Sequence, residues 1–151
     1  MNAFASLRLS DHFRAGEFRC AGFIKCAPCA CHGAVNVDPV LLDALEHIRA
    51  QVIGGPVIVL SGFRCDPYNA HVGGHPRSYH RFGVAADILC LDEKMDETAA
   101  RIGQALKELL IDRGNVIYYP FRKFIHIDVG GVTPAKPRVR RNDSKPKPRG
   151  Y

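Results

Sequence analysis

Hydrophobic residues recur at helical spacing in two stretches of the chain. The first stretch begins at Asp38-Pro39, where an aspartate can accept hydrogen bonds from free amides and proline suits the first helical position, and it ends at Gly54-Gly55. Its apolar side comprises Leu41, Leu42, Leu45, Ile48 and Val52. The second stretch ends at Gly114, and its apolar side comprises Ala99, Ile102, Leu106, Leu109 and Leu110. Both patterns predict amphipathic helices with one buried side.

Shorter apolar runs have the length and composition of β-strands. They are PVIVLSG (56–62), VAADILCL (84–91), NVIYYP (115–120) and FIHIDV (124–129). The last two runs predict a hairpin with its turn around Pro120 to Lys123. Residues 64–83 are rich in Gly, Pro, Asn and His, and they predict a long loop of the kind that often carries function. This order of elements predicts an α+β fold with a mainly antiparallel sheet flanked by helices.

The composition is that of one soluble globular domain. The chain has 151 residues, of which 46% are hydrophobic and 24% are charged, so it can form a single core. No run of uncharged apolar residues is long enough to cross a bilayer, which predicts no membrane span. The first residues lack the pattern of a signal peptide, so we expect synthesis in the cytoplasm without export by the general route.

The net charge of +6 is concentrated at the C-terminal end. Residues 134–151 contain seven Lys or Arg, one Asp and four Pro, whereas the rest of the chain is neutral. Because this segment has few apolar side chains to bury, we predict a domain over residues 1–133 and a flexible basic tail over residues 134–151. The tail could bind an anionic envelope polymer or, as a second candidate, nucleic acid; alternatively it only aids solubility. The neutral body gives nucleic-acid binding no further support.

Two carboxylates lie within apolar strands, where a buried charge needs a partner or a metal ion. Strand alternation places Asp128 on the same face as His126. A turn at Gly83 would let His80 fold back toward Asp87. Two imidazoles and one carboxylate, with a fourth position left to water, form the ligand set of catalytic zinc sites. The alternative is that the histidines are hydrogen-bonded core residues and the aspartate belongs to an ion pair.

Two segments together resemble a known enzyme group. SGFRCDPYNAHVGGHPRSYHRFGVAADI and FIHIDVGG carry the motifs S-G-[FY]-R, S-x-H-x-x-G-x-A-x-D and h-H-h-D, with h an apolar residue. They resemble the zinc D-Ala-D-Ala carboxypeptidases and L-alanyl-D-glutamate endopeptidases, which share their core with Hedgehog domains. The resemblance covers roughly residues 10–131. It implies a Hedgehog/DD-peptidase-like fold, with His80, Asp87 and His126 as ligands of a catalytic Zn²⁺ that activates water.

The resemblance also implies roles for two further residues. Arg64 matches an arginine that binds substrate and stabilises the oxyanion, a role suited to a guanidinium because it stays charged and presents several donors. It could instead satisfy loop carbonyls. Ser78 matches a substrate-contacting serine in some members, although it could equally cap a turn.

The general base is where the sequence departs from the resembled enzymes. The glutamate that some members carry three residues before the last histidine ligand is replaced by Lys123, and the histidine that others carry two residues before it is replaced by Phe124. Asp128 is the local substitute that we predict as the base, since a carboxylate can accept the proton of water. It could instead orient a ligand histidine. The loop residues His71 and His75 are alternative proton carriers.

Cysteines cluster near the N-terminus. Four of them lie within twelve residues, namely Cys20, Cys26, Cys29 and Cys31. They could bind a second, structural zinc ion, form two local disulfides or remain free thiols. Cys65 and Cys90 could pair with each other, although a cysteine on an apolar strand is typically a core residue.

The resemblance, together with these features, implies a zinc metallopeptidase that hydrolyses amide bonds of peptidoglycan stem peptides or cross-links. It would be of the carboxypeptidase or endopeptidase type and would act at the bacterial cell wall or in the periplasm. Its small size and lack of a signal peptide resemble a phage or prophage lysis enzyme, or endolysin. The alternative is a non-catalytic, zinc-containing domain that binds the cell wall or assembles in a virion.

Overall fold

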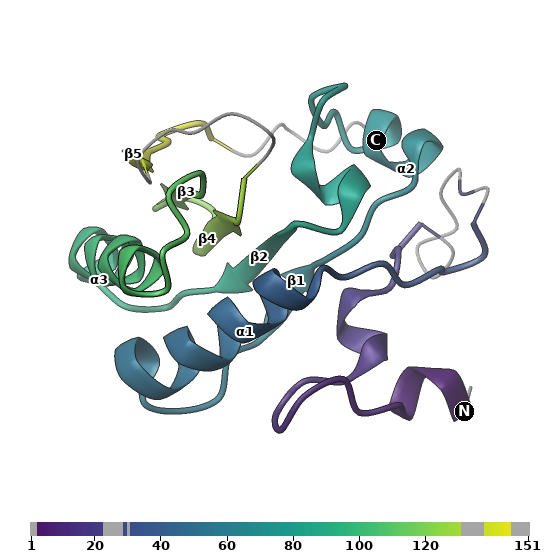
Figure 1. Cartoon of the computed structure of the whole chain (residues 1–151). Helices are drawn as coiled ribbons and strands as arrows, with labels where there is room; N and C mark the ends of the chain where they lie inside the picture. Colours follow the sequence, from purple (N-terminus) through teal and green to yellow (C-terminus); the bar gives the residue numbers. More distant parts are fainter. Residues whose placement is uncertain (1–2, 23–28, 30, 131–137, 146–151) are drawn as a thin grey trace.

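The fold is built around one five-stranded sheet with the strand order β1-β2-β4-β3-β5 (Figure 1). The structure, a computed structural model, describes residues 3–22, 29, 31–130 and 138–145. The strands are β1 (Val59–Ser61), β2 (Ala85–Leu89), β3 (Asn115–Tyr119), β4 (Phe124–Asp128) and β5 (Arg138–Arg141). All neighbours pair antiparallel except β3 and β5, which are parallel. The predicted α+β fold with a mainly antiparallel sheet is therefore confirmed, as is the hairpin that joins β3 to β4.

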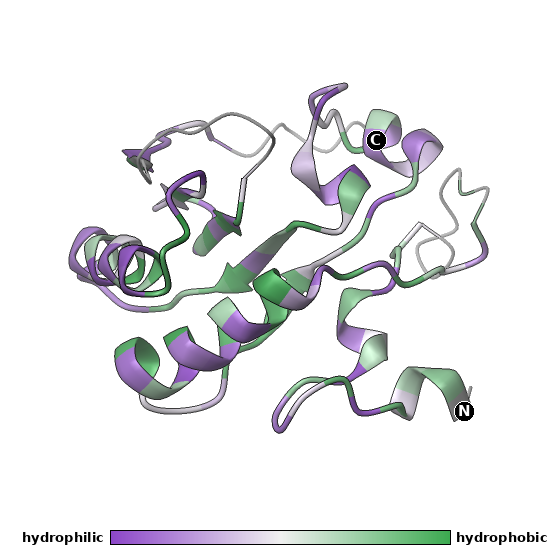
Figure 2. Cartoon of the chain, in the orientation of Figure 1, coloured by the Kyte–Doolittle hydropathy of each residue, from purple (hydrophilic) through white to green (hydrophobic). Residues whose placement is uncertain are grey.

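Two amphipathic helices form the main core with the sheet. They are α1 (Pro39–Ile48), which continues as the π-helix η3 (Arg49–Ile53), and α3 (Met95–Glu108). Asp38 caps α1 as predicted, because its side chain accepts from the Val40 amide at 2.8 Å. Hydrophobic and hydrophilic residues alternate along both ribbons in Figure 2, as expected for helices with one buried side. The largest fully buried core side chains include Leu41, Leu45, Ile48, Ile88, Ile102, Leu106, Val116, Ile125 and Ile127.

The segment between β1 and β2 contains two short helices, so the prediction of a long loop is wrong for these residues. They are α2 (Asp66–His71) and the 3-10 helix η4 (Tyr79–Phe82). Helices of six and four residues are too short to show a repeated apolar pattern in the sequence. The turn predicted at Gly83 is present. Its φ of 71° is left-handed, and a Cβ there would lie 2.6 Å from the Asn36 carbonyl oxygen, so both conformation and space favour glycine.

Part of the predicted tail belongs to the sheet. Arg138–Arg141 form β5, and the Asn142 amide donates to the Tyr118 carbonyl at 2.8 Å just beyond it. The prediction of a flexible extension is therefore wrong for these residues. Backbone pairing with the edge of β3 requires no apolar side chains, and Val139 lies against Gly103 of α3. Residues 134–137 and 146–151 lie outside the described part of the chain, and the domain boundary after residue 133 stays a prediction.

The N-terminal segment carries the 3-10 helices η1 (Ala3–Ser6) and η2 (Ala15–Phe18). Phe13 and Phe18 pack edge to face in the main core with ring centroids 5.9 Å apart. Glu46 of α1 accepts from the Ser10 hydroxyl at 2.6 Å and from the His12 amide at 2.8 Å. These contacts join the N-terminal segment to α1. Among the described residues, none of the helices combines the length and apolarity required of a membrane span.

Candidate metal centre

Three side chains converge above the central strands. Asp87 on β2 lies directly opposite His126 on β4 in the antiparallel register, so both project from the same face. His80 reaches them from η4, which ends at Phe82 just before the turn at Gly83. The His126 Nδ1 to Asp87 Oδ1 distance is 2.9 Å, and His80 Nε2 lies 3.2 Å from each of these two atoms. The structure therefore brings together the three residues that the sequence predicts to meet.

The donor set fits a zinc ion in chemistry and in spacing. Zinc binds imidazole nitrogen and carboxylate oxygen at about 2.0–2.2 Å, so tetrahedral ligand atoms lie roughly 3.3 Å from one another. The observed separations of 2.9–3.2 Å are close to this value. The outer nitrogen of each histidine faces an oxygen acceptor, so in a neutral imidazole the inner nitrogen has a lone pair, and three electron-rich atoms meet at the centre. The arrangement therefore favours a shared cation over a purely hydrogen-bonded cluster.

The outer nitrogen of each histidine is held by a fixed acceptor. His80 Nδ1 lies 2.7 Å from the Gly62 carbonyl oxygen, which directs Nε2 toward the centre. His126 Nε2 lies 3.1 Å from Asp128 Oδ2, and Asp128 in turn accepts from the backbone and side-chain amides of Asn115 at 3.2 and 3.1 Å. Such partners fix the tautomer of a ligand histidine and raise its basicity. Of the two roles left open for Asp128, these contacts favour the orienting one.

The electrostatics of the centre are set by burial and by the contacts among its members. Burial by itself would raise the pKa of Asp87, but hydrogen bonds and charge interactions with His126 and His80 hold this pKa well below its usual range. Burial would lower the pKa of His126, whereas Asp128 and Asp87 together raise it to about 9. The two carboxylates thus make the centre a strong binding place for positive charge.

Arg64 is tied to the centre rather than to loop carbonyls. It lies between β1 and α2, and its Nη2 donates to Asp87 Oδ2 at 2.8 Å. Its Nε donates to the Ser61 hydroxyl at 2.9 Å. Its backbone amide donates to the His80 carbonyl at 3.0 Å, which couples this loop to η4. These contacts place a guanidinium beside the ligand set, where an oxyanion stabiliser would be needed.

The centre lies in an open pocket of about 480 Å³. Ser78 and His75 line this pocket, whereas His71 and Lys123 are not among its lining residues. Sequence reasoning missed several other lining residues, including Arg77, Tyr119, Arg122 and Arg140. The predicted hairpin could have revealed Tyr119 as a lining residue, because its register pairs Tyr119 with Phe124 across β3 and β4. The two rings stack with centroids 4.3 Å apart. The guanidinium of Arg122 lies 5.0 Å from the Phe124 ring centroid.

A second group of chemically active side chains lies beside this site. Cys20, Cys29 and Cys31 meet Cys65, the residue that follows Arg64. Cys26, which the sequence places in the same cluster, lies outside the described residues. The pairing of Cys65 with Cys90 does not occur, since both are free and the Cys65 sulfur lies 3.6 Å from that of Cys20.

Two oriented histidines and an aspartate in an open pocket form a ligand set that metal-dependent hydrolases use. A family model described as Peptidase M15 matches residues 16–128, about three quarters of the chain, and this range includes the whole ligand set. The chain therefore belongs to the peptidase M15 family, whose members are zinc-dependent peptidases. Comparison with curated proteins gave no match.

Proposed function

We propose that this protein hydrolyses amide bonds in the stem peptides or cross-links of peptidoglycan, as a carboxypeptidase or an endopeptidase. The observation that supports this proposal is the convergence of His80, Asp87 and His126, at 2.9–3.2 Å, in a pocket lined by arginines. Zinc held by these residues would polarise the scissile carbonyl and lower the pKa of a bound water to about 7.

The charge of the pocket supports an anionic peptide as the substrate. Four guanidinium groups line it, those of Arg64, Arg77, Arg122 and Arg140. The acidic residues that line it, Asp87 and Asp128, already have histidine partners. Guanidinium groups bind carboxylates through parallel hydrogen bonds, and peptidoglycan stems carry several free carboxylates. The stacked Tyr119 and Phe124 rings offer a flat apolar wall for the small side chains of such a peptide.

Residues around the ligand set have separate roles in the proposed hydrolysis. Arg64 stabilises the negative charge that develops on the carbonyl oxygen, since it stays charged and has N–H groups beyond those that Ser61 and Asp87 occupy. Ser78 contacts the substrate backbone at the pocket wall. Asp128 orients His126. The proton of the attacking water needs an acceptor. Because Asp128 is engaged by His126 and Asn115, we propose His75 of the pocket lining for this role.

Digestion of purified peptidoglycan tests the proposal. Zinc-loaded protein should release stem peptides or D-alanine that mass spectrometry identifies, and chelation should abolish the release. His80→Ala should be inactive, whereas His71→Ala, a histidine away from the pocket, should retain activity. Full activity after removal of metal would refute the zinc mechanism. A folded, metal-loaded but inert wild-type protein would instead favour a non-catalytic domain that binds the wall or assembles in a virion.

We further propose that the protein acts at the cell wall or in the periplasm, as a phage or prophage lysis enzyme would. The basic C-terminal segment would then bind an anionic polymer of the envelope. Because β5 belongs to the sheet, the variant that tests this should lack only residues 145–151. At low salt this variant should bind the wall more weakly than the full chain does. At high salt the two proteins should bind equally, because salt screens the charges of the tail. Equal binding by both proteins at low salt would refute the attachment.

A further inference from the structure

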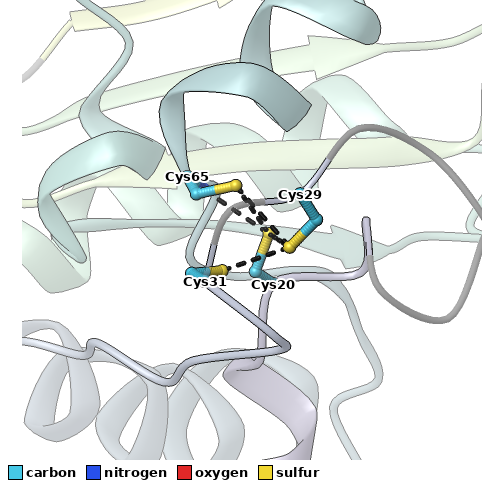
Figure 3. Close-up of side chains that lie close together, drawn as sticks. All are labelled: Cys20, Cys29, Cys31 and Cys65. Atoms are coloured by element: carbon cyan, nitrogen blue, oxygen red, sulfur yellow. Dashed lines mark hydrogen bonds between the residues drawn. The ribbon is translucent and has the colours of Figure 1, made fainter.

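Four cysteine sulfurs meet where the N-terminal segment passes the start of α2 (Figure 3). The Cys20 sulfur lies 3.8 Å from that of Cys29 and 3.6 Å from that of Cys65. The Cys29 sulfur lies 3.7 Å from that of Cys65 and 3.3 Å from that of Cys31. Figure 3 shows the four side chains directed toward one another from three separate places along the backbone. All four sulfurs lie within 4.8 Å of one another.

This spacing matches tetrahedral metal coordination. A zinc ion binds thiolate sulfur at about 2.3 Å, so sulfurs at the corners of its tetrahedron lie roughly 3.8 Å apart. The bonded sulfurs of a disulfide would lie about 2.05 Å apart, and the four cysteines are free. Thiols are weak hydrogen-bond donors and weak acceptors, so contacts among four of them contribute little cohesion. A cation shared by four thiolates gives this arrangement a physical cause.

The surrounding structure has little else to hold the sulfurs together. The cysteines belong to a small apolar cluster separate from the main core, in which Tyr68 is the only buried residue besides Cys20 and Cys65 among those described. Within the described part of residues 19–35 there is no helix or strand beyond a single bridge between Arg19 and Val35. Small segments that lack a core of their own are commonly stabilised by a structural metal ion.

We propose that Cys20, Cys29, Cys31 and Cys65 bind a structural zinc ion, separate from the catalytic centre. Four protein ligands close the coordination sphere and leave no position for water or substrate, which is the property of structural zinc sites. Cys65 supplies the ligand that the local sequence assigns to Cys26.

The site would join the N-terminal segment to the loop that presents Arg64. Cys65 is the next residue along the chain, and its backbone amide lies 3.5 Å from the Cys20 sulfur. Two residues earlier in each segment, the Phe63 amide donates to the Phe18 carbonyl at 2.9 Å. The ion would therefore fix the position of the loop from which Arg64 reaches Asp87.

Metal analysis of two variants separates the sites. The purified wild-type protein should contain two equivalents of zinc per chain. His126→Ala should keep one equivalent, at the cysteines, and Cys31→Ser should keep one, at the histidines. Two matched controls, Cys90→Ser and Cys26→Ser, should keep both. A His126→Ala variant without zinc, or a Cys31→Ser variant that keeps as much zinc as the wild type, would overturn the proposal.

Cobalt substitution provides a second measurement that does not depend on folding of the cysteine variants. Co²⁺ bound by four thiolates absorbs strongly through thiolate-to-metal charge transfer, whereas Co²⁺ bound by histidine and aspartate does not. This absorption should be present in the wild type and in His126→Ala. Its absence from both would overturn the proposal. Loss of peptidase activity with the absorption retained would count against the proposed function alone.

Discussion

Replacement of Asp128 with alanine removes the acceptor that holds the outer nitrogen of His126. Asp128 is 2% exposed and bridges His126 to Asn115, so the variant removes a hydrogen-bond acceptor from both of these half-buried partners. Loss of such an orienting carboxylate typically weakens metal affinity or activity about 10–100-fold. This corresponds to roughly 1.4–2.8 kcal/mol of zinc binding free energy. Loss of the hydrogen bonds to Asn115 should in addition cost about 1 kcal/mol of folding stability.

Competition with a chromophoric chelator measures the zinc affinity, and single-turnover hydrolysis at saturating zinc measures the chemical step. If Asp128 orients His126, zinc affinity should fall, and excess zinc should restore most of the activity. If Asp128 is instead the general base, affinity should stay unchanged while the chemical step is lost even at saturating zinc, a result that would refute the orienting role. Asp43→Ala, which changes an exposed aspartate on α1, is the matched control and should change neither quantity.

Three further predictions concern stability and substrate binding. Burial would raise the pKa of Glu46, but hydrogen bonds from Ser10 and His12 outweigh this effect and lower it. The charged form of Glu46 therefore stabilises the fold at pH values above the usual glutamate pKa. This stabilisation is lost as the pH falls through the lowered pKa of the folded state. Glu46→Gln should therefore reduce the unfolding free energy by about 1 kcal/mol at neutral pH. Denaturant titrations should show this difference shrink as the pH falls below the usual glutamate pKa; a constant difference would contradict this. Gly83→Ala should destabilise the fold by about 1–3 kcal/mol, since its φ is 71° and Asn36 leaves no space for a Cβ; an unchanged melting temperature would contradict this. Arg122→Ala should raise KM for a peptide with a free carboxylate more than for its amidated analogue; equal effects would rule out carboxylate recognition.

Some signals of the metal centre are local, whereas the grouping of His80, Asp87 and His126 also depended on the motif resemblance. Alternation along β4 places Asp128 beside His126, and the turn at Gly83 is visible as a glycine between a polar segment and an apolar strand. The opposition of Asp87 and His126 follows once β2 and β4 are neighbours, and the motif spacing supports that arrangement.

The features that sequence reasoning missed depend on contacts between distant segments. Cys65 joins Cys31 across 34 positions, and nothing near Cys65 in the sequence indicates this partner. Strand β5 was missed because the charge and proline content of its surroundings argue against burial, whereas its pairing with β3 relies on backbone groups. Helix α2 was missed because six residues are too few to show helical periodicity.

Strand β5 separates part of the substrate-binding surface from the residues that hold the metal. The match to the family ends at residue 128, yet Arg140 of β5 lines the pocket. One wall is thus supplied by a stretch of chain that follows the segment matched by the family model. Exchange of residues 138–141 would alter the charge presented to the substrate while leaving the zinc ligands and their supports in place. Substrate preference would then change while the residues that hold the metal stay the same.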